Sequence, residues 1–444
     1  MDRLSITEWK PVTGSVPPRS QEDWEAEFAK YRESPEFKIL NSRMTLEEFK
    51  SIYWMEWIHR LWGRFIGLSF VVPAAYFIAK KRVSIPMRRG LFLISGLIGF
   101  QGFIGWWMVK SGLKDDLFAT GSHPRVSQYR LTTHLGAAFI LYVTMLWNGL
   151  DILRTNKLLS QTPEASSSIL SQLRNPALRS FKGSVGALAA LVFITAMSGG
   201  LVAGLDAGLI YNEFPYMGLG LTPPKSELFD KFYSHTEDHS DLIWRNFLEN
   251  PSLVQLDHRI LATTTFSIVM AMWAWTRYSS QLKAALPRAA AKGMHGVVGF
   301  VWLQVILGIT TLLYLVPTHL ASTHQAGSLA LLTWTVVLGS RVWLPSKLIQ
   351  NIVAERMKAA VAAGGKMQAQ GAQISNAAQS AVLKGAGNGS ANAATASNLA
   401  AGGIGLLPLG LWFVSNSEIT TQEELNSVGK AQVEFLQRQS RKET

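Results

Sequence analysis

The chain has 444 residues, of which 48% are hydrophobic and only 16% are charged. A soluble protein of this length carries charge on about a quarter of its residues, so the composition favours a polytopic helical membrane protein over a large soluble domain. The net charge of +12 comes without a basic and aromatic RNA-binding motif, and we expect no nucleic-acid partner. Cysteine is absent from the sequence, which excludes disulfides, thiolate catalysis and covalently attached c-type haem.

The N-terminal region, residues 1–55, is predominantly polar and precedes the first long apolar run. We expect it to form a loop and insert outside the membrane. Residues 1–18 show neither the apolar core of a signal peptide nor the Arg-rich pattern of a transit sequence.

Apolar runs predict seven membrane-spanning helices, since each run approaches the roughly 20 residues that a helix needs to cross a bilayer. The predicted spans are residues 56–79, 91–109, 131–150, 184–204, 259–277, 294–316 and 320–340. Basic residues cluster after the first, third, fifth and seventh spans, whereas the loop at 205–257 is rich in Asp and Glu. The positive-inside rule therefore places the basic loops in the cytoplasm, or in the matrix of a mitochondrion.

The C-terminal region differs in composition from the spans. Residues 359–403 consist mostly of Ala, Gly, Ser, Asn and Gln, and such a segment buries too little apolar surface to offset the entropy of ordering. We predict a disordered low-complexity tail there, followed by a second tail segment at 404–444.

The two halves of the chain repeat one another. The matching motifs are EWIHR at 56–60 with QLDHR at 255–259, QGFIG at 101–105 with QVILG at 304–308, TH at 133–134 with TH at 323–324, and ITEWKPVTG at 6–14 with YNEFPYMG at 211–218. An even number of spans separates the first pair of motifs, so the halves face the same way. The second half has a span before its YNEFPYMG loop that the first half lacks. We therefore expect two tandem four-helix bundles, at 56–158 and 184–343, the first without its first helix in this chain.

Four histidines occupy repeat-matched positions at the starts of spans that run from the acidic side to the basic side: His59, His134, His258 and His324. A single histidine at such a place is more often a hydrogen-bonded interfacial residue, but two pairs, each within one predicted bundle, favour ligation. A pair of histidines without cysteine is typical of a non-covalent haem, so the pattern predicts two haems. A zinc site is less favoured, because neither pair has a nearby carboxylate or thiolate.

The residues beside these histidines extend both predicted sites. Arg60 and Arg259 follow a histidine directly, and a guanidinium suits either a haem propionate or a simple interfacial charge. Glu56 lies one turn before His59, and its counterpart in the second half is Gln255. The carboxylate could accept a proton or stabilise a cation, or it could be an acid favoured by the helix dipole. The acid-to-amide difference favours chemistry in the first half and an accessory role in the second.

The other five histidines give weaker evidence of a functional site. His235 and His239 in the acidic loop could form a metal site, although solvated side chains are commoner at such a spacing. His123, His295 and His319 lie at span ends, and we interpret them as interfacial residues.

The motifs SITEWKP at 5–11, EWIHRLWGR at 56–64, QGFIGWWMVKSG at 101–112 and QLDHR at 255–259 resemble those of haem A synthases of the mitochondrial and alphaproteobacterial type. The resemblance covers about residues 4–343. It implies oxidation of the C8 methyl of haem O to a formyl group, giving haem A for cytochrome c oxidase. His59 and His134 would flank the substrate haem O with Glu56 beside the reacting methyl, while His258 and His324 would hold a haem b.

The same resemblance implies a location and partners. The location is the mitochondrial inner membrane with residues 1–55 on the intermembrane-space side, or the plasma membrane in a bacterium. The implied electron donor is a ferredoxin-type protein. Haem O synthase, oxidase assembly factors and a second copy of the chain are further candidate partners.

Two other functions stay open from the residues alone. One is a di-haem b electron-transfer cytochrome, although such carriers place their haems towards opposite membrane faces and these four histidines start from one face. The other is a haem-binding assembly or transport protein. The haem types extracted from purified protein would separate these alternatives from a synthase.

Overall fold

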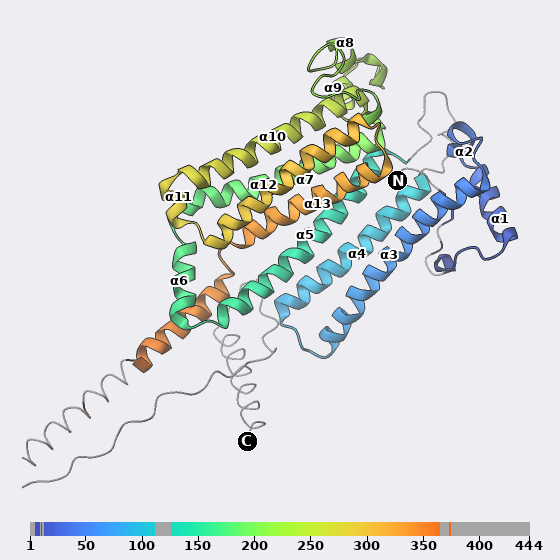
Figure 1. Ribbon diagram of the computed structural model, residues 1–444. Helices are drawn as coiled ribbons and strands as arrows, with labels where there is room; N and C mark the ends of the chain where they lie inside the picture. The colour runs from blue at the N-terminus through green and yellow to red at the C-terminus, as the bar shows by residue number, and fades with distance from the viewer. Residues whose placement is uncertain (1–4, 9, 11–12, 112–125, 365–372, 374–444) are drawn as a thin grey trace, which may run out of the picture. The chain divides into compact units, whose positions relative to one another are not determined.

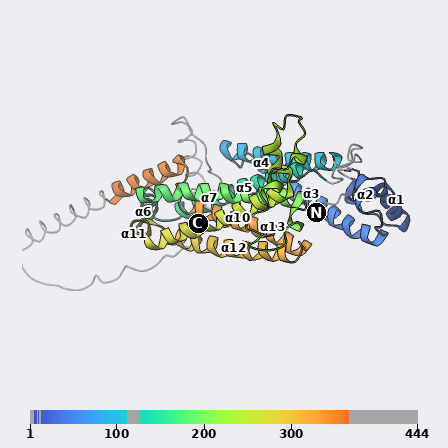
Figure 2. The same cartoon turned by 90° about the horizontal axis from the view of Figure 1, so that it is seen from above.

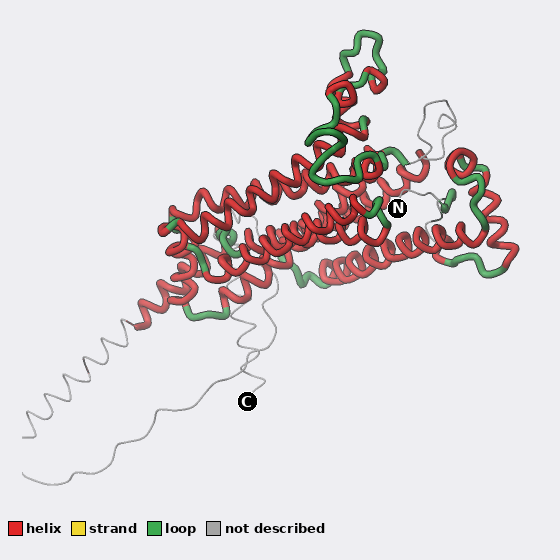
Figure 3. Tube along the Cα trace, turned by 45° about the horizontal axis from the view of Figure 1, so that its top comes forward, coloured by secondary structure: helices red, strands yellow, loops and turns green. Residues whose placement is uncertain are grey.

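The computed structural model describes residues 5–8, 10, 13–111, 126–364 and 373. Within these residues the chain is helical and has no strand, as Figure 3 shows, which confirms the all-α class predicted from the sequence. The chain divides into two compact units, one formed by Met1–Leu150 with Asn175–Trp343 and the other by Asp151–Arg174 with Leu344–Thr444.

In the described part of the chain, seven long helices coincide with the seven predicted spans (Figures 1 and 2). They are α3 Leu46–Ala79, α4 Ile85–Ser111, α5 Gln128–Leu159, α7 Arg179–Gly204, α10 Pro251–Tyr278, α12 Arg288–Leu313 and α13 Thr318–Ser340. Five of them, α3, α4, α5, α7 and α12, are long and apolar enough to cross a membrane. α10 and α13 fall outside this set of five, and they pack against α7 and α12. The protein is therefore a multi-pass membrane protein.

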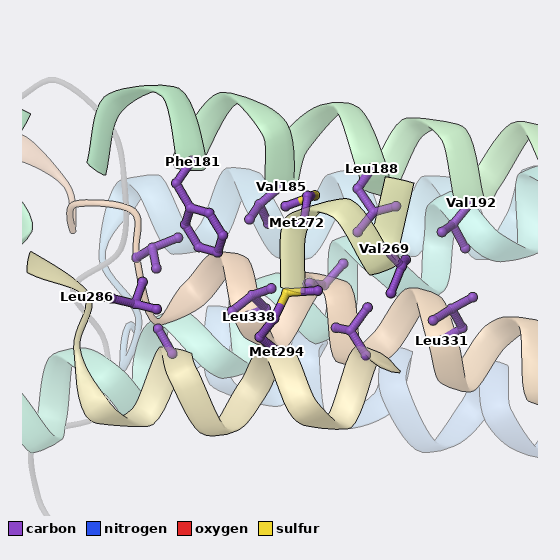
Figure 4. Packing of buried hydrophobic residues seen from close by; sticks show 14 of the residues in the cluster. Phe181, Val185, Leu188, Val192, Val269, Met272, Leu286, Met294, Leu331 and Leu338 are labelled. Carbon is purple, nitrogen blue, oxygen red and sulfur yellow. The ribbon is translucent and has the colours of Figure 1, made fainter. Parts of the chain in front are cut away.

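α7, α10, α12 and α13 pack around a shared apolar core. Figure 4 shows Phe181 and Val185 of α7 beside Met272 of α10, Met294 of α12 and Leu338 of α13, and all five side chains are buried. Lipid is as apolar as these side chains, so the cluster stabilises the bundle mainly through close van der Waals packing rather than through removal from water.

The helices α3, α4 and α5 form a second group. α3 packs on α4, and the Gln101 amide on α4 donates to the backbone carbonyl of His134 on α5 at 3.0 Å. The hydroxyls of Tyr142 and Thr333, 2.9 Å apart, link α5 to α13. α3 and α4 also expose large apolar side chains, which include Trp62, Phe65, Leu68, Val72, Phe92 and Leu93. These side chains suit contact with lipid.

The structure shows that most of residues 13–55, predicted as a loop and insert, form short helices. The structure has a short 3₁₀ turn, η1 Thr13–Ser15, then α1 Gln21–Arg32 and α2 Pro35–Leu40, and α3 already begins at Leu46. Capping boxes at Ser20 and Thr45 start α1 and α3. Buried aromatic residues from α1 and α3 form a common cluster of Trp24, Phe28, Tyr31, Phe49 and Tyr53. The insert is therefore a small helical subdomain on an extension of α3.

The acidic loop predicted at 205–257 also contains helices. It holds η4 Ala207–Leu209, α8 Lys225–Leu228, η5 Lys231–Tyr233 and α9 Leu242–Glu249, and α10 begins at Pro251. The Asn250 side chain caps α10, and proline occupies its first turn, where the missing N–H has no intrahelical partner to lose. The predicted start at residue 259 was therefore too late, because polar residues obscured the first turns.

The second unit contains α6 Pro163–Leu173 and a helix over residues 347–364. Leu158, Leu170, Ile349 and Val353 form its buried cluster. Residues 359–364, assigned to the predicted tail, belong to this helix. The rest of 359–403, apart from residue 373, and all of 404–444 lie outside the described residues.

Candidate functional site

The structure brings the four repeat-matched histidines together as two facing pairs. His59 of α3 and His134 of α5 have ring centroids 6.5 Å apart, with their planes at 70°. His258 of α10 and His324 of α13 have centroids 6.4 Å apart, with planes at 89°. The pairing predicted from the repeat is therefore the pairing in space, with nearly the same separation in both halves.

This separation suits a metal ion held between each pair. An imidazole nitrogen binds a metal at about 2 Å and lies about 1 Å from its ring centroid, so two opposed ligands place their centroids about 6 Å apart. Haem iron takes its axial ligands from such side chains. His59 is the exposed member of the four, whereas His134, His258 and His324 are partly buried. The geometry of both pairs fits bis-histidine haem ligation.

Two glycines allow the second pair to lie close to neighbouring helices. A Cβ added at Gly199 of α7 would lie 3.1 Å from Cε1 of His258, and one added at Gly308 of α12 would lie 3.1 Å from Cε1 of His324. Both positions are therefore too tight for most side chains. Gly308 belongs to the repeated QVILG motif, but Gly199 was missed, and its only sequence signal is the paired glycine at Gly200.

Ser198 is a second residue that the sequence analysis missed. Its hydroxyl lies 2.8 Å from Nδ1 of His258. A serine among the small residues of an apolar helix carries no pattern that distinguishes it from a packing residue.

The two arginines make equivalent contacts in the two halves. Arg60 donates to the backbone carbonyls of Ile6 at 3.0 Å and Glu8 at 3.2 Å. Arg259 donates to the carbonyls at 211 and 213, the matching loop positions, at 3.1 and 2.9 Å. The sequence repeat is therefore preserved in individual hydrogen bonds. These bonds hold the loops beside each histidine pair, and contact with a haem propionate stays a prediction.

Glu56 is held by the N-terminal segment. Its Oε2 accepts hydrogen bonds from the Ser5 amide at 2.8 Å, the Ser5 hydroxyl at 2.6 Å and the Ile6 amide at 2.9 Å. Its Oε1 accepts from Arg60 at 2.6 Å. Both carboxylate oxygens are thus engaged by donors.

Gln255 makes the opposite type of contact. Its amide nitrogen donates to the carbonyls of Ala207 at 3.0 Å and Tyr211 at 3.2 Å, while its oxygen accepts from Arg259 at 3.4 Å. The facing loop offers acceptors here and donors in the first half. The acid-to-amide difference therefore has a local structural cause, and by itself it no longer separates a chemical role for Glu56 from a structural one.

A polar network joins α5, which carries His134, to α9. The Tyr129 hydroxyl donates to Glu249 at 2.7 Å, and Arg245 donates to the same carboxylate at 2.8 Å. Burial raises the pKa of Asp241, but hydrogen bonds from Ser234, the His235 amide and Arg245 outweigh it and hold that pKa well below its ordinary value. The network therefore joins the first turn of α5 to the end of α9.

The remaining histidines stay outside the paired sites. Nε2 of His235 lies 3.9 Å from Glu249, and His239 has a positive φ of 51° in an exposed turn. Nδ1 of His295 lies 2.9 Å from a backbone carbonyl of its own helix, and His319 is in the first turn of α13. His123 lies outside the described residues.

Comparison with known proteins gives a family match over most of the chain. The model of the COX15-CtaA family, described as cytochrome oxidase assembly protein, matches residues 3–336. The chain is 50% identical over 374 residues to "Heme A synthase COX15" of Saccharomyces cerevisiae, covering 84% of this chain and 76% of that protein. It is 42% identical over 335 residues to "Heme A synthase" of Nitrosospira multiformis, covering 74% and 83%.

A third relative carries an additional domain. "Heme A synthase-mitochondrial ferredoxin fusion protein" of Schizosaccharomyces pombe is 49% identical over 352 residues, which cover 79% of this chain and 56% of the fusion. The similarity therefore extends to mitochondrial and bacterial proteins and to one that is joined to a ferredoxin.

Proposed function

The chain belongs to the COX15-CtaA family of cytochrome oxidase assembly proteins, and we propose that it is a haem A synthase. In this proposal it is an oxidoreductase that oxidises the C8 methyl of haem O twice, and the resulting gem-diol loses water to leave the formyl group of haem A. The observation that carries the proposal is the pair of facing histidines in each half, in a chain 50% identical to a haem A synthase. The comparisons do not favour an electron-carrying cytochrome or a haem transporter.

We assign the first histidine pair to the substrate. His59 is exposed, and the large apolar side chains around it on α3 are exposed as well. A site that takes up haem O and releases haem A needs such access. His59 and His134 would hold and orient the porphyrin so that its methyl group meets the same protein groups in each turnover.

We assign the second pair to a resident haem b, which would supply electron transfer when bound. His258 and His324 lie within the tightly packed bundle of α7, α10, α12 and α13, close to Gly199 and Gly308. This closer packing supports a cofactor that stays in place.

In the proposed reaction, Glu56 acts as a fixed negative charge beside the substrate. It lies one turn before His59 on α3, and both of its oxygens accept hydrogen bonds. A carboxylate held in this way is better suited to stabilise positive charge that develops at the methyl carbon than to take up a proton. Arg60 would keep this carboxylate in place, and Arg259 would organise the matching loop in the second half.

We further propose a ferredoxin-type electron donor and a location in the mitochondrial inner membrane, or the plasma membrane in a bacterium. The fused ferredoxin of the Schizosaccharomyces pombe relative supports the donor. The basic segments after α3, α5, α10 and α13 support an orientation with those ends in the matrix.

The test of this function is conversion of haem O by the purified full chain. Protein in detergent or vesicles is supplied with haem O, a reduced ferredoxin and oxygen, and the haems are extracted and separated by chromatography. We expect haem A to accumulate, together with the hydroxymethyl intermediate. Recovery of haem O unchanged, under conditions in which a yeast relative converts it, would contradict the proposal.

A further inference from the structure

The hydroxyl of Ser198 makes two hydrogen bonds at the second histidine pair. Ser198 lies on α7 and is only 9% exposed. Its Oγ lies 2.8 Å from the backbone carbonyl of Thr195 and 2.8 Å from Nδ1 of His258. The serine therefore bridges the backbone of one helix and the ring of a residue on another.

Only one arrangement of protons satisfies both contacts. A carbonyl oxygen can only accept, so the single hydroxyl proton of Ser198 is donated to Thr195. The hydroxyl oxygen must then accept from Nδ1 of His258, which carries the ring proton. In that tautomer Nε2 is unprotonated, and its lone pair is available to a metal.

Neighbouring contacts fix the position of this hydroxyl. The side chains of Thr195 on α7 and Thr265 on α10 are 2.9 Å apart, so the two helices are joined one turn from Ser198. Gly199 lets the His258 ring approach the α7 backbone, since an added Cβ would lie 3.1 Å from its Cε1. The ring is thus held at one edge by the hydroxyl and at another by the helix.

We propose that Ser198 is a positioning residue for the haem ligand His258, which it holds in the tautomer and orientation that bind iron through Nε2. The proposal rests on the proposed function, in which His258 and His324 ligate haem b. An acceptor behind a ligating imidazole also raises the basicity of the ligand and so favours the oxidised metal.

The contact is specific to one member of the pair. Among the described residues, Nδ1 of His324 has no hydrogen-bond partner, and the same holds for Nδ1 of His134 in the first half. Ser198 therefore makes the two axial ligands of the resident haem unequal, with His258 the firmly oriented one.

The experiment compares Ser198→Ala with Ser198→Thr in the full chain, with Ser328→Ala as the matched control. Ser328 lies on α13 one turn beyond His324, and its hydroxyl donates only to the backbone carbonyl of Gln325. The readouts are the midpoint potential of the bound haem, by redox titration, and the haem affinity, by transfer to an acceptor protein. Loss of a hydrogen-bond partner behind a ligating imidazole typically changes metal affinity by about 10- to 100-fold.

We expect Ser198→Ala to shift the midpoint potential to a more positive value and to weaken haem binding by about 10- to 100-fold. Ser198→Thr should keep the midpoint potential and the haem affinity of the parent protein, and Ser328→Ala should change neither. If Ser198→Ala does not accumulate, Ser198→Cys keeps the volume with a weaker acceptor and should shift the potential in the same direction.

If the midpoint potential is unchanged in the Ala or Cys variant and the parent protein binds haem normally, the role of Ser198 is contradicted, whereas the proposed function is not. A parent protein without a bis-histidine haem contradicts the proposed function itself. A shift of equal size in Ser328→Ala would show that any lost hydroxyl near the haem has this effect, and it would also overturn the inference.

Discussion

Replacement of Glu56 by Gln separates a chemical role for this residue from a structural one. The carboxylate accepts four hydrogen bonds, three of them on Oε2 from Ser5 and Ile6 and one on Oε1 from Arg60. An amide in its place can keep one oxygen towards the Ser5 and Ile6 donors. Its NH₂ group then faces the Arg60 guanidinium, which is also a donor, and that hydrogen bond is lost.

The cost of this loss follows from the burial of the pair. The side chains of Arg60 and Glu56 are 11% and 16% exposed, so solvent screens them only weakly. A hydrogen bond to a charged group contributes about 1.5–3 kcal/mol. Arg60 also donates to the carbonyls of Ile6 and Glu8, so a loss of its position should increase local opening of residues 5–8 by about 10- to 100-fold. Hydrogen exchange of the Ser5 and Ile6 amides measures this opening directly.

Ser5→Ala supplies the matched control, because it removes one donor to Glu56 and leaves the charge in place. Its effect on local opening should resemble that of Glu56→Gln. If the carboxylate also stabilises charge at the substrate methyl, Glu56→Gln should lower haem A formation by a further factor of about 100 to 10,000. Haem chromatography of both variants gives the comparison.

Two results would refute this reasoning. Equal losses of haem A in Glu56→Gln and Ser5→Ala would leave Glu56 as an anchor for the N-terminal segment only. Normal haem A from Glu56→Gln would remove both roles. The reverse substitution, Gln255→Glu, would place a carboxylate against the carbonyls of Ala207 and Tyr211, and we expect it to destabilise the second half without stopping chemistry in the first.

Three further predictions address ligation, sidedness and pH. His258→Ala or His324→Ala should remove haem b, while His59→Ala or His134→Ala should abolish haem A formation and leave haem b bound. If a variant keeps normal haem content and normal haem A formation, the replaced histidine is not a ligand. Single cysteines placed in the loop at 205–250 should react only from the intermembrane-space side, and labelling from the matrix side alone would reverse the topology. The pKa of Asp241 in the folded protein is lowered from 3.8, so its ionised carboxylate stabilises the α9 region fully at neutral pH. This stabilisation is lost as the pH falls below 3.8. Proteolysis of Asp241→Asn at pH 7 should therefore be faster than that of the parent protein, and equal rates would contradict this.

The sequence predicted the long helices and the histidine pairs well, because both depend on strong local patterns. Long apolar runs give the spans, and a repeated motif such as EWIHR and QLDHR places His59 and His258 at the same register of equivalent helices. The pairing of His59 with His134 then follows from the order of the helices. The 6.5 Å separation of the rings agrees with that inference.

The N-terminal helices were missed because their stability comes from tertiary packing. α1 has only scattered apolar residues, and Trp24 and Phe28 are buried against Phe49, which lies well beyond them in the chain. The capping box at Ser20 with Asp23 was the available signal. The predicted start of the fifth span lies after the first residue of α10, because Gln255 and Asp257 interrupt the apolar pattern of the first turns of this helix.

The contacts around the histidines could not be predicted from the sequence. Ser198 and His258 are 60 positions apart, and no local pattern joins them. The donors that face Glu56 and the acceptors that face Gln255 belong largely to the loop backbone, so residue identities alone suggested a chemical asymmetry where the structure also shows a difference in loop contacts.

The proposed haem A synthase activity is tested by the haem content of the purified full chain before and after incubation with haem O, reduced ferredoxin and oxygen. We expect haem b in the protein as isolated, retained throughout, and new haem A after incubation. If the protein holds haem b at both times and the added haem O is recovered unchanged, without haem A, the proposed function is contradicted.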